Sequence, residues 1–71
     1  MTKDGAKRIS ELMLAFGAKL DESLGRIKQE ESEEEFKRYR TAVSKLMTTM
    51  LLEVMNPLYA EHPDLKPREL T

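Results

Sequence analysis

Apolar residues recur every three or four positions in two separate runs, and this spacing constrains the fold more than any other feature of the sequence. The positions that share one helical face in the first run are Ile9, Leu12, Met13, Phe16, Leu20, Leu24 and Ile27. On an α-helix this face is a stripe about 120° wide. The pattern therefore predicts an amphipathic helix over about residues 5–28, with the carboxylate of Asp4 as its N-cap.

The second run opens with Ser32-Glu33-Glu34-Glu35, which has the spacing of a helix capping box. The apolar face that follows consists of Phe36, Tyr39, Val43, Leu46, Met50 and Val54. It predicts a second helix over about residues 33–55. Carrying the first stripe forward from Ile27 places Phe36 on the opposite face, since an α-helix has 3.6 residues per turn. We therefore expect a break within residues 28–31 and two antiparallel helices. One continuous rod is the alternative, because this segment contains no glycine or proline.

The second helix becomes apolar over a wider arc in its C-terminal half. The additional apolar positions there are Met47, Leu51, Met55 and Leu58. They widen the arc to roughly 200°, more than one neighbouring helix can cover. We therefore expect an all-α helical hairpin that dimerises into a four-helix bundle. The expected interface residues are Leu46, Met47, Met50, Leu51, Val54, Met55 and Leu58. The alternative is that the C-terminal tail folds back and covers the extra face.

The size of the chain supports association. Its 71 residues include no cysteine and are 39% hydrophobic, so disulfides cannot supplement a small core. A domain of this length buries roughly 60% of the surface of its unfolded chain and is marginally stable alone. We expect a single helical domain over residues 1–71 that is completed by a homodimer partner.

Prolines divide the C-terminal tail. Pro57 is expected to end the second helix, or to kink one longer helix, and a short turn or helix is predicted over about residues 57–62. Beyond it, residues 63–71 form a tail that we expect to be extended at first and frayed from residue 68 onward.

Catalytic chemistry is not indicated. His62 is the one histidine, and we expect it to be exposed to solvent or to cap a helix. No serine stands where helical spacing would bring it beside that imidazole, and no glycine-rich phosphate loop occurs. The sequence therefore predicts a protein that is not an enzyme and that holds no metal or cofactor. Uncharged runs such as Leu46–Leu52 are far shorter than the ~20 residues of a membrane span, and the N-terminus does not resemble a signal peptide. We expect a cytoplasmic protein without a membrane partner.

One basic patch on the second helix could contact nucleic acid, through Lys37, Arg38, Arg40 and Lys45. The net charge of −1 gives no general attraction to nucleic acid. Glu33 and Glu34 also stand four residues before the first two cations, where ion pairs within the helix are expected. The sequence therefore favours a small non-enzymatic, homo-oligomeric interaction or regulatory protein. A nucleic-acid-binding regulator and an accessory subunit of a larger enzyme are the alternatives.

Overall fold

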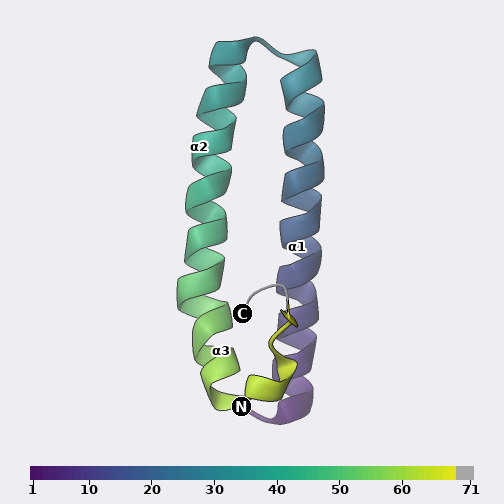
Figure 1. The fold of residues 1–71 in the computed structure, drawn as a ribbon, viewed down its shortest axis with the longest axis vertical. Helices are drawn as coiled ribbons and strands as arrows, with labels where there is room; N and C mark the ends of the chain where they lie inside the picture. Colours follow the sequence, from purple (N-terminus) through teal and green to yellow (C-terminus); the bar gives the residue numbers. More distant parts are fainter. Residues whose placement is uncertain (69–71) are drawn as a thin grey trace.

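The computed structural model describes residues 1–68, which form an antiparallel helical hairpin with a tail folded back onto it (Figure 1). The elements are α1 (Lys3–Glu30), α2 (Glu33–Thr49), the π-helical segment η1 (Met50–Met55), α3 (Asn56–Glu61) and the 3-10 turn η2 (Pro63–Leu65). The expected all-α hairpin with a short C-terminal tail is confirmed.

Two residues reverse the chain between the long helices. Glu31 and Ser32 are both extended, with ψ angles of 170° and 159°. The Ser32 hydroxyl accepts a hydrogen bond from the Glu35 amide at 3.2 Å, so the predicted cap is present. The break between residues 30 and 33 excludes the continuous rod. Neither linking residue has a positive φ, so the turn needs no glycine.

The first helix begins two residues earlier than predicted. Thr2, and not Asp4, is its N-cap, because the Thr2 hydroxyl accepts a hydrogen bond from the Gly5 amide at 3.2 Å. Threonine and aspartate can both cap a helix, so the sequence left the choice open. Asp4 lies in the first turn, where its negative charge suits the positive end of the helix dipole.

The second helix changes its winding before it reaches the proline. Residues Met50–Met55 are π-helical, and the Asn56 amide donates to the Leu51 carbonyl five residues before it. Pro57 has no N–H, and in an α-helix its ring would clash with the carbonyl four residues earlier. The wider turn stands directly before this proline, and α3 continues without a gap. The segment expected to be helical over about residues 33–55 is thus α-helical to Thr49 and π-helical to Met55, and α3 (Asn56–Glu61) lies where a short helix was expected over about residues 57–62.

The core is small and lies at the open end of the hairpin. Its buried members are Ala6, Met55, Leu58 and Tyr59, with Ile9, Met13 and Leu65 packed against them. Across this core the hydroxyl groups of Ser10 and Tyr59, both buried, form a hydrogen bond of 2.6 Å. This bond joins α1 to α3 over 49 positions of sequence.

The tail differs from the extended segment that the prolines predicted. Pro63–Leu65 form a 3-10 turn, and Lys3 of α1 forms an ion pair with Asp64. Because the turn and the ion pair hold it, the tail lies along the start of α1 (Figure 1). The fraying expected from residue 68 onward falls mostly on residues 69–71, which lie outside the described residues.

Candidate interaction surfaces

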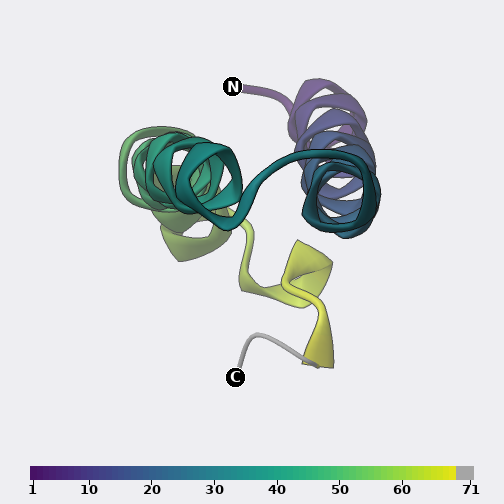
Figure 2. The same ribbon diagram turned by 90° about the horizontal axis from the view of Figure 1, so that it is seen from above.

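The hairpin has two flanks, and the tail covers part of only one. Viewed along the helices, the tail lies on one side of the α1–α2 pair (Figure 2). We call this side the tail flank, and on α1 it includes Ser10, which binds Tyr59, and Leu14 one turn later. Phe16 lies about 160° round the helix from Leu14, on the other side. We call that other side the open flank.

The register of the open flank follows from one hydrogen bond between the helices. The hydroxyl groups of Ser23 and Tyr39 lie 2.6 Å apart and connect α1 to α2. A step of seven residues along a helix returns to within about 20° of the same face. One such step from this bond toward the open end of the hairpin leads to Phe16 on α1 and Leu46 on α2. The next level toward the open end holds Ile9 and Glu53, because these two residues line one hollow together; Glu53 lies in η1, where the α-helical step does not apply.

Large apolar side chains remain exposed along the open flank. Leu12 is 52% exposed, Phe16 50% and Leu46 54%. An isolated exposed leucine is ordinary in a folded protein. Here the three side chains cluster on one side of a two-helix layer, with Ile9 toward one end and Tyr39 toward the other. A contiguous apolar patch of this kind is typical of a binding surface.

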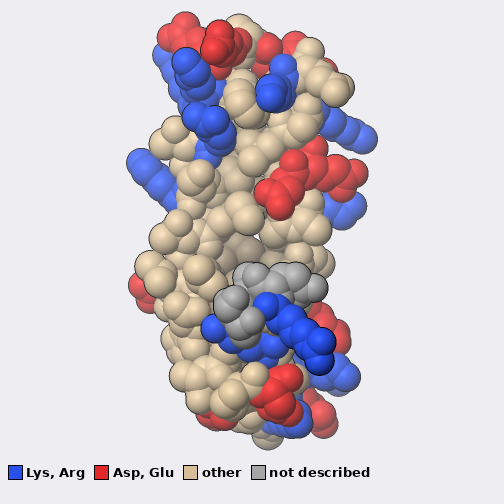
Figure 3. All heavy atoms as spheres, viewed as in Figure 1, with Lys and Arg blue, Asp and Glu red and all other residues tan. Residues whose placement is uncertain are grey.

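The tail flank carries a second apolar surface beyond the reach of the described tail. A groove of about 280 Å³ is lined there by Leu14, Met47, Thr48, Met50, Leu51 and Met55. All of these but one are apolar. On this face uncharged side chains cover most of the lower half of the α2 side, with acidic side chains only at its edges, whereas charged side chains gather near the helix connection and along the lower α1 side (Figure 3).

The predicted interface residues fall in three places. Met55 and Leu58 are each only 7% exposed and belong to the core, so the fold-back of the tail accounts for these two. The groove on the tail flank contains Met47, Met50 and Leu51. The open flank holds Leu46, and Val54 lines the hollow at its end. The sequence pattern placed Leu12 and Phe16 on the apolar stripe of the first helix. These two residues lie at the edge of that stripe, which was the signal that they could lie outside the contact between the helices.

Three of the four cations of the predicted nucleic-acid patch have partners within the helix. Lys37 lies 3.6 Å from Glu33, and Arg38 lies 3.5 Å from Glu34 and 3.8 Å from Glu35. The Arg40 guanidinium stands 5.7 Å from the centre of the Phe36 ring, a cation–π contact. The i,i+4 ion pairs expected from the sequence are therefore confirmed.

Among residues 1–68 the fourth cation, Lys45, forms no ion pair. Its side chain alone would therefore be free for a phosphate without breaking a contact.

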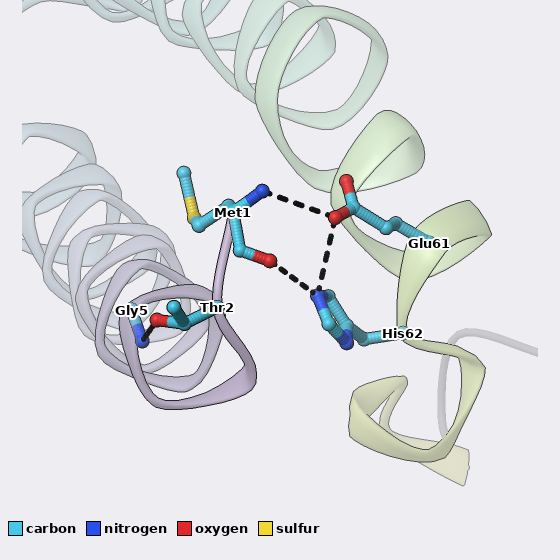
Figure 4. Close-up of polar contacts among 5 residues, drawn as sticks. All are labelled: Met1, Thr2, Gly5, Glu61 and His62. Carbon is cyan, nitrogen blue, oxygen red and sulfur yellow. Dashed lines mark hydrogen bonds and ion pairs between the residues drawn. The ribbon is translucent and has the colours of Figure 1, made fainter.

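The N-terminus meets the end of α3 at Glu61 and His62 (Figure 4). The Met1 ammonium group binds the Glu61 carboxylate at 3.1 Å, and the Met1 carbonyl lies 3.1 Å from Nε2 of His62. His62 stands at the C-cap of α3 and is less exposed than expected, since its side chain is 18% exposed. Local sequence could not show a contact between residues 61 positions apart.

The contact of Met1 with Glu61 and that of Lys3 with Asp64 each lower the pKa of the carboxyl group. The hydrogen bond from the Met1 ammonium group, followed by its charge, lowers the pKa of Glu61. The hydrogen bond from Lys3 is the main cause that lowers the pKa of Asp64. Within the described residues, no three His, Asp or Glu side chains are placed to hold a metal ion. Over the same residues, no helix has the length and hydropathy of a membrane span.

We compared the chain with protein-family models, with curated proteins and with solved structures, and none of them matches it.

Proposed function

We propose that the chain is a non-enzymatic interaction protein that works as a homo-oligomer and associates through its open flank. The observation that carries this proposal is the exposure of Leu12, Phe16 and Leu46 on one side of the hairpin. Burying a large apolar side chain is worth about 1.5–3 kcal/mol. A partner that covered all three would therefore contribute substantially to the stability of so small a core.

The dimensions of the chain support the same proposal. It measures 44 × 19 × 16 Å, with a radius of gyration of 14.3 Å, whereas about 11 Å is usual for this length. Its surface is 5592 Å², compared with about 4,500 Å² for a typical monomer of this mass. The excess of about 1,100 Å² exceeds the ~800 Å² that each partner buries in an interface of standard size.

The two alternative functions have less support. Nucleic-acid binding through the basic patch would have to displace the glutamates that already pair with Lys37 and Arg38. An accessory subunit of a larger enzyme would use the same exposed flank as the proposed homodimer. Its apolar residues would then be buried by another protein, so the isolated chain would stay monomeric.

Sedimentation equilibrium tests the proposal with two matched variants. Leu46→Glu charges the open flank, whereas Leu52→Glu charges η1 at a leucine that lines neither the groove nor the hollow. The two leucines are 54% and 56% exposed, so the substitutions should disturb a single chain about equally.

We expect the wild type and Leu52→Glu to sediment at twice the 8.2 kDa of one chain, and Leu46→Glu to sediment as a helical monomer. A wild type that stays monomeric at high micromolar concentration, with a Tm independent of concentration, would refute self-association.

A further inference from the structure

The open flank has charged edges of opposite sign. On α1, Leu12, Lys19 and Arg26 follow one another at intervals of seven residues and therefore lie on nearly the same face. Arg8 stands one turn before Leu12. Lys19 and Arg26 line a hollow there with Ser23 and Glu22. The edge of α1 is therefore mainly basic.

The opposite edge is acidic. Glu35 stands three turns before Leu46 and about 20° from its direction, and Glu53 lines the hollow at the far end of the flank. Within residues 1–68, neither Arg8 nor Glu53 takes part in an ion pair, and the same is true of Lys19 and Arg26. Glu35 already lies 3.8 Å from Arg38 of its own helix, so Glu53 is the unpaired acidic group of this edge. A basic edge and an acidic edge thus border the apolar centre of the flank.

We propose that the partner of the open flank is a second copy of the chain, related by a two-fold axis parallel to the long axis of the hairpin. This proposal rests on the function proposed above. A rotation about this axis does not change the position of a residue along the hairpin, so residues at one level, meaning one position along the long axis, stay at that level in both copies. The rotation places α1 of one copy beside α2 of the other. The two helices in contact then run antiparallel, as in a four-helix bundle.

The register of the hairpin fixes which charges meet in this arrangement. Ile9 and Glu53 occupy the same level, so Arg8 of one copy faces Glu53 of the second copy. Ser23 and Tyr39 mark a level nearer the helix connection. About one turn beyond that level, Arg26 of one copy faces Glu35 of the second copy. Each dimer therefore gains two symmetric sets of opposite charges around the apolar centre.

A two-fold axis perpendicular to the helices would give a different set of neighbours. With this axis at the height of Phe16, α1 would pack against α1 of the second copy. Residues before Phe16 in one copy would then face residues after Phe16 in the other. Arg8 of one copy would then lie near Arg26 of the other. Like charges at an interface are destabilising and select against such pairings. The distribution of charge along the flank therefore selects the parallel axis.

Cysteine cross-linking distinguishes the two axes, because the chain has no cysteine of its own. Arg8→Cys mixed with Glu53→Cys should form a disulfide between chains under mild oxidation. Arg8→Cys mixed with Arg26→Cys should not. Lys45→Cys, on the outer side of α2, is the control for random collision. Preferential linkage of Arg8→Cys to Arg26→Cys would overturn the parallel axis. So would the absence of linkage in both mixtures while the wild type is dimeric.

Charge exchange gives an independent readout. Arg8→Glu and Glu53→Arg should each raise the dimer Kd by about tenfold, since each substitution acts twice in a symmetric dimer. The double variant should return to within about threefold of the wild type, because it restores opposite charges. Additive losses in the double variant would refute the pairing but leave the proposed function intact. A monomeric wild type would refute both.

Discussion

The hydrogen bond between Ser10 and Tyr59 should contribute measurably to stability, because it is the buried polar link between the tail and α1. The two hydroxyl groups lie 2.6 Å apart, and each residue is 5% exposed. Tyr59→Phe keeps the ring in the core but leaves the serine hydroxyl without this partner. Leaving a buried polar group unpaired costs about 1–3 kcal/mol, so we expect a loss in that range.

A double-mutant cycle separates the hydrogen bond from the packing around it. Ser10→Ala should also cost about 1–3 kcal/mol, since it leaves the tyrosine hydroxyl unpaired. The double variant Ser10→Ala/Tyr59→Phe removes both polar groups together and should lose clearly less than the sum of the two single losses. Urea unfolding followed by circular dichroism at a fixed protein concentration measures all four free energies of unfolding. Additivity within about 0.3 kcal/mol would mean that the bond contributes nothing.

The second serine–tyrosine pair provides a matched control. Ser23 donates its one hydroxyl proton to the Leu20 carbonyl at 2.7 Å, so the Tyr39 hydroxyl must donate to Ser23. Both partners are only part-buried. Water can replace this bond, and Tyr39→Phe should cost about 0.5–1.5 kcal/mol, less than Tyr59→Phe. Equal losses would contradict the assignment of the tail contact as the more deeply buried one.

Three further outcomes are expected. Ser32→Ala should lower the free energy of unfolding by about 0.5–2 kcal/mol, because it removes the cap of α2, and urea unfolding would measure the loss. Leu51→Glu should leave the dimer intact, because Leu51 lines the groove on the tail flank; dissociation in sedimentation would move the interface to that flank. Acid should weaken the contacts of Glu61 and Asp64 that help to hold the tail. The lowered pKa values of Glu61 and Asp64 stabilise the folded state above the ordinary carboxyl range near pH 4, and this contribution is lost as the pH falls through the lowered values. Amide exchange at residues 58–65 measured across the acid range would show protection lost there before it is lost in α2.

The features that could be predicted from the sequence are those decided within a few residues. Apolar residues recurring every three or four positions predicted both long helices, and Ser32 predicted the start of the second because its hydroxyl acts only three residues away. The ion pairs of Lys37 and Arg38 followed from the same local geometry. The N-cap of the first helix was missed by two residues, since two capping residue types stand close together.

Contacts between residues far apart in the sequence determine the placement of the tail and the exposed surfaces. The width of the second apolar arc showed that more than one neighbour was needed, but not which neighbour. The tail reaches the core through Tyr59, whose partner Ser10 lies 49 positions away, and through Asp64, whose partner is Lys3. A polar serine on the first helix gives no sign in the sequence that it will receive the tail. The exposure of Leu12 and Phe16 is likewise a property of the assembled hairpin.

The π-helical segment η1 explains why the wide apolar arc of the second helix contributes partly to the core and partly to the open flank. A wider turn advances less per residue than an α-turn, so it shifts the face that the following residues present. Met55 and Leu58 thereby enter the core, while Leu46, before η1, stays on the open flank. A replacement of Pro57 that restored an α-turn in η1 would rotate Met55 and Leu58 relative to α1. The tail contact and the hollow lined by Glu53 and Val54 are therefore linked through η1, and a change in the winding there would alter both.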